Sequence, residues 1–380
     1  MTRNVFVYSD QLSRFRAYDG YPWLFERSDA VLGLCRQHGL MDRDDVALRG
    51  PIPVSDEALR TFHDGPYLET LAKANDGTFE EEMLMVGLGT IECPVYRGCF
   101  DYHRLVVGST LAGAAAICEP DVSVAFVPTA GMHHAGPDFA SGFCYLNDAV
   151  IGIKDLLARG LRVLYVDIDA HHGDLVQAAF YEEPRVLKVS FHESPETLFP
   201  FHTGFAHEMG AGAGEGYNVN VPLPAGAGDE AYRVAFEGLV PSLAAAFEPD
   251  VVVATLGADA LASDPLTHLM LTTEGYCHLV GWLGRLAPKV LALGSGGYLL
   301  NSVARALTLA FATLVGEPIH DDAELLFGGV FRGDGLVSLH DLPIYVPEQT
   351  RREAHAAAMA AVEHVGSHQL QVLVAAQARR

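Results

Sequence analysis

Apolar and polar positions along the chain follow two alternating patterns. Short continuous runs of Val, Leu and Ala are typical of strands buried on both faces of a sheet. These runs predict strands at 5–9, 122–127, 163–169, 186–192, 251–257 and 290–293. Longer segments between them have a helical character and predict helices at 28–38, 102–118, 147–159, 229–247, 273–286 and 300–314. Strands and helices in alternation predict an α/β fold with a central, mostly parallel sheet and helices on both faces.

The chain reads as one domain followed by an extension. No Ser- or Pro-rich linker interrupts residues 1–345, so we expect a single domain there. Residues 346–380 are Ala-rich and polar with high helix propensity, which predicts a C-terminal helical extension. The Gly-rich stretch 204–216 precedes a strand-like segment at 217–222 and lacks the Lys of a phosphate-binding loop, so we expect a surface loop.

Composition narrows the class of protein. The 380 residues are 49% hydrophobic and 19% charged, which is enough for a large core and excludes a disordered chain. The net charge of −23 argues against direct nucleic-acid binding, although it would attract cationic substrates such as lysine-rich peptides or polyamines. The six cysteines form no CxxC pair, no signal peptide is evident, and the uncharged run 105–118 is too short to span a bilayer. We therefore expect a cytoplasmic protein without a membrane segment, and the oligomeric state stays open.

The densest group of ionisable side chains follows the apolar run that begins at Val163. It reads DIDAHHGD over residues 167–174. Asp167 and Asp169 would point to one face of a strand, and His171 would share that face if the strand extends. Buried charges of this kind need compensation, and a divalent cation would supply it because Asp and His are good metal ligands. The alternative is an exposed turn of solvated charges.

Three more polar segments follow predicted strands. They are His133-His134, the GAD segment that ends at Asp259, and the GSGGY segment that ends at Tyr298. Ligands of open parallel sheets bind beyond the carboxyl ends of the strands, so we expect the segments to converge. Two carboxylates and one imidazole leave a metal coordinatively open, which predicts hydrolysis of an amide or a related carbonyl. No GxSxG nucleophile motif competes with this interpretation.

Several ordered motifs together carry a family resemblance. They are GMHHA at 131–135, SGFCYLND at 141–148, DIDAHHGD at 167–174, GAD at 257–259 with Asp264-Pro265, and GSGGY at 294–298. Over residues 4–345 the sequence resembles the zinc-dependent histone deacetylase superfamily. It looks most similar to the class I-like branch that includes bacterial acetoin-utilisation deacetylases. The resemblance implies a single-domain arginase/deacetylase-like fold and metal-dependent hydrolysis of N-acetyl lysine side chains in peptides or proteins.

The resemblance also assigns roles to single residues. The implied ligands of a Zn²⁺ ion, for which Fe²⁺ is a possible substitute, are Asp169, His171 and Asp259. His134, paired with Asp174, matches the general base and acid, and His133, paired with Asp167, matches a histidine that acts electrostatically. Tyr298 matches the tyrosine that hydrogen-bonds the scissile carbonyl and then its oxyanion.

A substrate tunnel and a structural ion are implied in the same way. The residues that match the tunnel and its mouth are Gly142, Phe143, Phe199, Leu266 and Glu92. Arg27 matches an arginine of the acetate exit channel. A structural K⁺ ion would be bound, largely through backbone oxygens, by Asp167, Asp169, His171, Ser190 and Phe191.

The chain departs from the family pattern at some positions, and alternative functions remain. Ser295 interrupts a run of four glycines, and Glu92 stands near the place where class I enzymes have an Asp. The alternatives are an acetylpolyamine amidohydrolase, an arginase-like ureohydrolase and a non-catalytic protein that binds acyl-lysine. The second would need another metal, for which GADALASDP at 257–265 offers few carboxylates.

Overall fold

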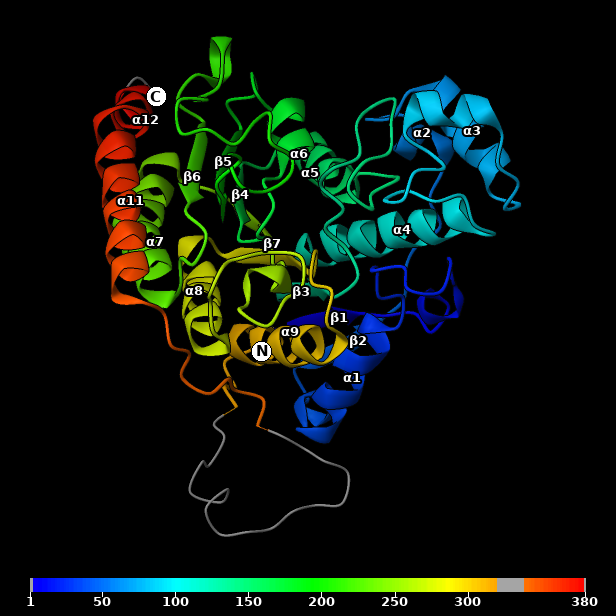
Figure 1. The fold of residues 1–380 in the computed structure, drawn as a ribbon, viewed down its shortest axis with the longest axis horizontal. Helices are drawn as coiled ribbons and strands as arrows, with labels where there is room; N and C mark the ends of the chain where they lie inside the picture. The colour runs from blue at the N-terminus through cyan, green and yellow to red at the C-terminus, as the bar shows by residue number, and fades with distance from the viewer. Residues whose placement is uncertain (1–2, 320–337, 379–380) are drawn as a thin grey trace.

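The computed structural model describes residues 3–319 and 338–378, which form one parallel sheet with helices around it (Figure 1). The order of the strands across the sheet is β2-β1-β3-β8-β7-β4-β5-β6, and every pairing of neighbours is parallel. The strands are β1 (Arg3–Val7), β2 (Val46–Arg49), β3 (Val122–Val127), β4 (Val163–Asp167), β5 (Val186–Glu193), β6 (Asn218–Leu223), β7 (Val251–Thr255) and β8 (Lys289–Leu293).

Helices cover both faces of this sheet. The helices α4 and α5 pack together on one face, and α1, α9, α8 and α7 pack side by side on the other. Their bounds are α1 (Arg27–Gln37), α2 (Asp56–Leu59), α3 (Gly65–Ala74), α4 (Cys99–Ile117), α5 (Asp148–Ala158), α6 (Asp174–Ala179), α7 (Asp229–Phe247), α8 (Thr273–Leu286), α9 (Leu300–Leu314), α11 (Glu348–Ser367) and α12 (Gln369–Gln377).

The central strands explain the predicted fold class. Every residue of β4 and β7 is buried, as continuous apolar runs indicate for strands that are covered on both faces. In β4, Leu164 and Val166 pack into the core layer under α7, α8 and α9, whereas Val163 and Tyr165 pack into the layer under α4 and α5. The prediction of an α/β fold with a parallel sheet and helices on both faces is confirmed.

Some elements differ from the sequence prediction. The edge strand β2 and the helices α2, α3 and α6 are absent from the predicted set, and all four are short or partly exposed. Strands β4 and β7 end two residues earlier than predicted. After β4, the backbone N–H groups of Asp169, Ala170 and His171 donate to carboxylates at 2.9–3.0 Å. The idea that His171 shares a strand face with Asp169 was therefore wrong.

The C-terminal helices pack on the edge of this fold. Helix α11 lies against α7 and β6, and α12 lies against α7. Their side chains Ala358, Val365 and Leu373 are buried in the same core as the sheet. The division into a domain at 1–345 and an extension at 346–380 stays a prediction, and residues 1–2, 320–337 and 379–380 lie outside the described residues.

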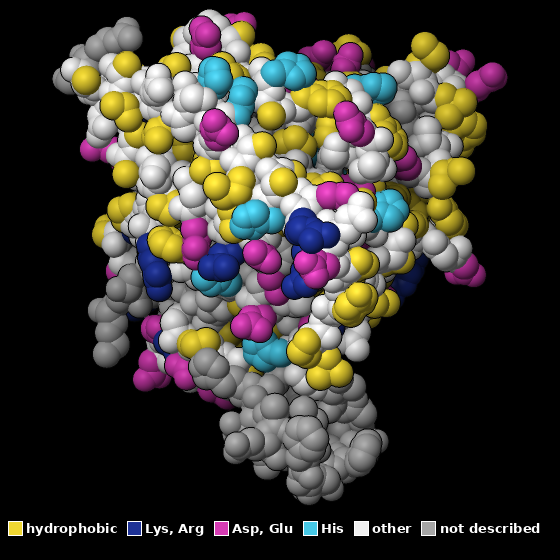
Figure 2. Space-filling view, turned by 60° about the vertical axis from the view of Figure 1, so that its left-hand side comes forward, with side chains coloured by type: hydrophobic (Ala, Val, Ile, Leu, Met, Phe, Trp, Pro, Cys, Tyr) yellow, Lys and Arg dark blue, Asp and Glu magenta, His cyan; other side chains and the backbone are white. Residues whose placement is uncertain are grey.

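With the α11 side turned forward, basic side chains lie in the middle of the face with acidic side chains among them, whereas its upper part shows acidic side chains and histidines without Lys or Arg (Figure 2). In the described part of the chain, no helix has the length and apolar character needed to cross a membrane.

Candidate metal centre and active site

Four neighbouring strands in the middle of the sheet carry the candidate site. In spatial order they are β3, β8, β7 and β4. The segment after β3 holds His133 and His134, and the segment after β8 ends at Tyr298. Asp259 follows β7, and residues 167–174 begin at the end of β4. The structure thus brings the four polar segments that the sequence singled out to one edge of the sheet.

The three predicted metal ligands lie together in the interior. One donor atom from each of Asp169, His171 and Asp259 lies within 4.8 Å of the others, and all three residues are buried. His171 Nδ1 is 3.2 Å from Asp169 Oδ1 and 3.1 Å from Asp259 Oδ2. Asp259 Oδ1 accepts the N–H of Ala170 at 2.9 Å, so its other oxygen is the one that faces the group.

The electrostatics of this group fit a divalent cation. Burial opposes a charge on His171, yet the carboxylates of Asp169 and Asp259 raise its pKa to about 10. Burial, and then the charge of Asp169, raises the pKa of Asp259 to about 7. A Cβ atom on Gly296 would lie 2.0 Å from Asp259 Oδ2, so only glycine leaves room for the carboxylate. Two carboxylates and one imidazole in a buried position form a donor set suited to a borderline metal such as zinc.

A pair of histidines lies beside the metal group. His133 Nδ1 is 3.0 Å from Asp167 Oδ2, and His134 Nδ1 is 2.8 Å from Asp174 Oδ1. The two ring centroids are 4.0 Å apart. Since each Nδ1 pairs with a carboxylate, the Nε2 atoms remain for other contacts. The sequence-predicted pairings of both histidines are present in the structure.

The two histidines have different environments. Burial disfavours a charge on His133, but Asp167 and Asp169 raise its pKa to about 9. For His134, burial and the neighbouring His133 and His171 push the pKa well below its ordinary value. The pair therefore divides into one histidine that favours the charged form and one that favours the neutral form.

Aromatic side chains surround the open side of the group. The Tyr298 ring lies 6.3 Å from the His171 ring and 5.4 Å from the Phe143 ring, measured between centroids. The Phe199 ring lies 5.0 Å from that of His134. Gly142 has a φ of 53°, and a Cβ there would lie 2.7 Å from the His134 ring, so a larger residue would displace the histidine.

The residues predicted at the mouth and the exit lie close to these walls. Leu266 is 39% exposed, and Glu92 accepts the N–H of Gly142 at 3.3 Å. Arg27 is fully buried in α1, and its guanidinium donates to the carbonyls of Ser295 and Gly297. Burial lowers the pKa of Arg27.

The two remaining residues of the predicted K⁺ site lie on β5. Ser190 pairs in register with Asp167 of β4, and its Oγ is 2.8 Å from His192 Nδ1. Phe191 stacks on Phe236 of α7 at 5.4 Å between centroids. This arrangement does not test potassium binding, which stays a prediction.

Three supporting residues had no role in the sequence prediction. Asp264 accepts the N–H groups of Tyr298 at 2.8 Å and Leu266 at 2.9 Å. Asp148 accepts the N–H groups of Gly131 and Met132, which precede the histidine pair. The Tyr165 hydroxyl donates to Asp167 Oδ2 at 2.6 Å. Asp264 and Asp148 lie inside the motifs that carried the resemblance, which was the available signal.

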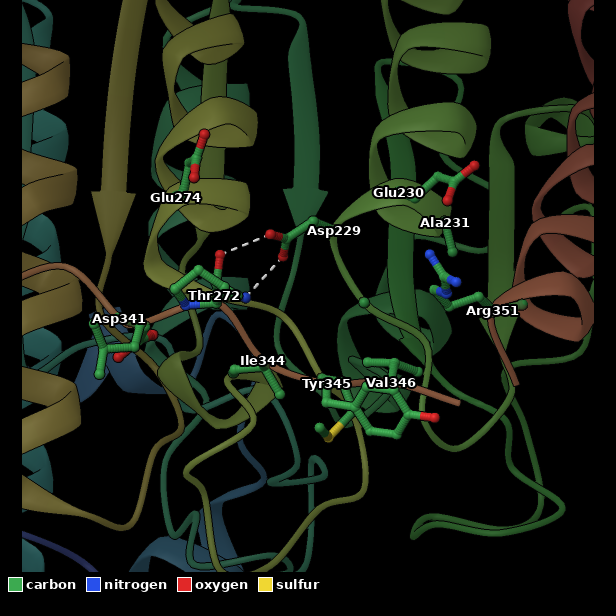
Figure 3. A pocket seen from close by; sticks show the side chains of 15 residues that line it. Asp229, Glu230, Ala231, Thr272, Glu274, Asp341, Ile344, Tyr345, Val346 and Arg351 are labelled. Carbon is green, nitrogen blue, oxygen red and sulfur yellow. Dashed lines mark hydrogen bonds between the residues drawn. The ribbon is translucent and has the colours of Figure 1, made fainter. Parts of the chain in front are cut away.

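A hollow in the surface is lined by other residues than the candidate active site. It has a volume of about 560 Å³ and lies between the N-terminal ends of α7 and α8 and residues 341–346 (Figure 3). Two of its carboxylates already bond the protein: Asp229 accepts both the N–H and the hydroxyl of Thr272 at 2.7 Å, and Asp341 accepts the N–H of Thr273. These bonds satisfy the beginning of α8, so the hollow is no competitor for the active site.

The fold and the site together define an α/β protein in which a buried Asp–His–Asp group that could hold a metal ion lies beside a histidine pair and a tyrosine. Comparisons with known proteins agree with this class. Residues 22–314 match the family model described as histone deacetylase domain. The chain therefore belongs to the histone deacetylase family, and its function is of the lysine deacetylase type.

Individual relatives give the extent of the similarity. The chain is 38% identical over 298 residues to histone deacetylase 8 of Xenopus tropicalis, covering 78% of this chain and 80% of the relative. It is 35% identical over 306 residues to histone deacetylase RPD3 of Saccharomyces cerevisiae, covering 80% and 70%. A crystal structure of an HDAC homolog complexed with SAHA matches with a TM-score of 0.83 at 31% identity, covering 95% of this chain and 100% of that one. The HDAC homolog from Aquifex aeolicus matches with a TM-score of 0.80 at 30% identity, covering 94% of this chain and 100% of that one. The placement in a bacterial branch of the family stays a prediction.

Proposed function

We propose that this protein hydrolyses the acetyl group from N-acetyl lysine side chains of proteins or peptides, with a Zn²⁺ ion bound by Asp169, His171 and Asp259. One observation carries the proposal: the ring centroids of His134 and Tyr298 lie 6.0 and 6.3 Å from that of His171. A base and a hydroxyl donor therefore flank the same buried metal group. A bound zinc ion would lower the pKa of a water molecule and polarise the acetyl carbonyl, and Fe²⁺ would supply the same chemistry.

The side chains then have separate tasks. His134 accepts the proton of the attacking water, while Asp174 holds the other ring nitrogen at 2.8 Å. Tyr298 donates its hydroxyl hydrogen bond to the acetyl oxygen, which becomes negatively charged as water adds. The protonated His134 delivers its proton to the leaving lysine nitrogen. The products are acetate and the free amine, and His133 with Asp167 acts electrostatically.

The channel residues select the substrate. Phe143 and Phe199 form apolar walls for the lysine methylenes, and Gly142 keeps the space beside His134 free. Glu92 lies at the mouth, where its carboxylate accepts N–H groups of the substrate backbone. Arg27, buried behind the Ser295–Gly297 carbonyls, lines the route by which acetate leaves.

We further propose a structural K⁺ ion near the zinc. Its ligands would be mainly backbone oxygens of the group Asp167, Asp169, His171, Ser190 and Phe191. The register pair of Asp167 with Ser190 supports this set, because it brings the ends of β4 and β5 together.

We also propose that the enzyme works in the cytoplasm, since its cysteines are free thiols, most of them buried.

The metal centre is tested by removing one ligand. Asp259→Ala is expected to lose most of its zinc, because only two of the three protein ligands remain. The measurement is elemental analysis of the purified protein. The matched control is Asp250→Ala, which removes an exposed carboxylate directly before the start of β7. This variant should keep the zinc content of wild type. Full zinc occupancy in Asp259→Ala would remove this residue from the ligand set.

The main alternative is an acetylpolyamine amidohydrolase, which has the same chemistry and needs a second anionic contact for the distant ammonium group. Leu266 is apolar and partly exposed at the mouth, which favours an acyl-lysine. We expect kcat/KM for an acetyl-lysine peptide to exceed that for acetylspermidine or acetylputrescine by at least about tenfold, or about 1.4 kcal/mol. A substrate panel assayed under identical conditions measures this ratio.

A matched pair of variants sharpens the substrate test. Leu266→Glu should shift the ratio towards the acetylpolyamines, whereas Leu342→Glu, an exposed leucine of the described chain that belongs to another surface, should leave it unchanged. Equal or better turnover of acetylpolyamines by the wild type would overturn the lysine assignment and leave the metal mechanism standing. The same panel with and without a chelator separates both enzymes from a non-catalytic binding protein.

A further inference from the structure

We propose that Ser295 is a positioning residue for the metal: its hydroxyl holds the carboxylate of Asp169 in the orientation that binds the ion. This inference rests on the proposed metal site. Ser295 lies in the segment after β8, between the metal group and the segment that leads to the histidine pair. It touches the ligand Asp169 and no reacting atom, so its role is to orient another residue.

The backbone of Ser295 indicates that its side chain has a purpose. Its φ is 55°, in the left-handed region that glycine adopts with ease and that other residues occupy under strain. The residue is 2% exposed, so solvent contact does not explain a polar side chain here. Glycine would fit this conformation without strain, and the feature that serine adds is a hydroxyl group.

The hydroxyl contacts a metal ligand directly. Ser295 Oγ lies 2.8 Å from Asp169 Oδ2 and 2.9 Å from the carbonyl oxygen of Gly131. A hydroxyl has one proton, and a carboxylate is a stronger acceptor than a neutral carbonyl. The hydroxyl therefore donates to Asp169. The N–H of Gly296 donates to the same oxygen at 2.8 Å.

These two bonds hold Oδ2 of Asp169, and the N–H of His171 donates to Oδ1 at 2.9 Å. The carboxylate therefore cannot rotate freely, and its Oδ1 lies 3.2 Å from His171 Nδ1. A ligand that is already oriented loses less freedom when the ion binds. Hydrogen bonds to ligating groups also tune their basicity, and removing such partners typically weakens metal binding about 10- to 100-fold.

The position of the hydroxyl is itself well determined. The N–H of Ser295 donates to the carbonyl of Ala130 at 2.5 Å, and its own carbonyl accepts from the guanidinium of Arg27. These main-chain bonds do not depend on the side chain. A substitution at Ser295 can therefore remove the hydroxyl and leave the loop in place.

The test compares two substitutions with a control. Ser295→Gly removes the hydroxyl and relieves the backbone strain, whereas Ser295→Ala removes the hydroxyl and keeps the strain. Ser302→Ala removes another buried hydroxyl, that of a residue in α9. This hydroxyl bonds Ser263 Oγ at 2.8 Å and does not contact Asp169. Three quantities are measured on the full chain: the zinc dissociation constant in competition with a chromophoric chelator, the visible absorption spectrum of the Co²⁺ form, and the thermal unfolding of the metal-free protein.

We expect both Ser295 variants to bind zinc about 10- to 100-fold more weakly than wild type and to show an altered Co²⁺ spectrum. Metal-free Ser295→Gly should unfold at the wild-type temperature or above it, which a purely structural role for the hydroxyl would not produce. Ser302→Ala should keep the wild-type affinity and spectrum. If Ser295→Gly binds zinc as tightly as wild type, the positioning role is wrong.

The same data separate this inference from the proposed function. The proposed metal site fails if the wild-type chain does not bind one zinc ion. It also fails if Asp259→Ala binds zinc as tightly as the wild type does. If Asp259→Ala loses zinc affinity while both Ser295 variants bind zinc as tightly as wild type, the metal site stands and the role of Ser295 is refuted.

Discussion

Replacing His134 by Ala is expected to lower kcat by about 10²- to 10⁴-fold, the usual contribution of a positioned general base and acid. The structural reason is the environment of this ring. Its Nδ1 pairs with Asp174 at 2.8 Å, so the opposite nitrogen serves the reaction. Burial and the neighbouring imidazoles keep its pKa well below the ordinary value, so the ring can accept a proton from water. Single-turnover assays on an acetyl-lysine peptide measure the effect on the chemical step.

The comparison with the neighbouring histidine makes this prediction specific. His133→Ala should cost less than His134→Ala, because His133 pairs with Asp167 and favours the charged form, which cannot act as a base. His278→Ala is a control, since this exposed histidine lies on α8 and pairs with Glu237 of α7 at 2.7 Å. Should His133→Ala prove the more damaging change, the roles of the two rings would have to be exchanged.

Replacing Tyr298 by Phe is expected to lower kcat by about 10²- to 10³-fold, as the loss of one oxyanion donor does. The N–H of Tyr298 is held by Asp264 at 2.8 Å, and the ring packs against Phe143, so the hydroxyl has a defined direction. Burial and the carboxylate of Asp259 raise the pKa of Tyr298 well above its ordinary range, which keeps the proton on the hydroxyl for donation.

The controls for Tyr298 separate catalysis from folding. Zinc content and thermal unfolding of Tyr298→Phe should match wild type, because the substitution removes one oxygen atom only. Tyr8→Phe also removes a tyrosine hydroxyl, one that donates to Asp29 at 2.8 Å, and it should keep wild-type kcat. A near-wild-type kcat for Tyr298→Phe would mean that the loop after β8 does not direct this hydroxyl at the carbonyl.

Sequence reasoning succeeded where local pattern and chemistry coincide. The continuous apolar runs at β4 and β7 predict strands buried on both faces, and every residue of both strands is buried. The short edge strand β2 escaped prediction because its residues are only partly buried and follow no such run. The sequence predicted the end of β4 two residues too late. Three backbone N–H groups that follow this strand donate to carboxylates, and a hydrophobic pattern does not reveal such bonds.

The candidate site shows the same division. The rule that ligands bind at the carboxyl ends of parallel strands brought His134, Asp169, Asp259 and Tyr298 to one edge in the prediction. The sequence did not predict the supporting contacts of Asp264, Asp148 and Tyr165. These residues form hydrogen bonds to partners that lie 2 to 34 positions away in the chain. Such pairs cannot be inferred from spacing.

By itself, the sequence determined the class of fold, the strand ends that carry polar groups and the ligand chemistry of the site, because burial pattern and residue type are local properties. Only the tertiary structure decided the order β3-β8-β7-β4 in space, which differs from the order of these strands along the chain. That order puts the segment after β8 between the histidine pair and the ligands, where Ser295 and Gly296 reach Asp169. Long-range packing of helices on the two faces selects this order, and no short stretch of the chain encodes it.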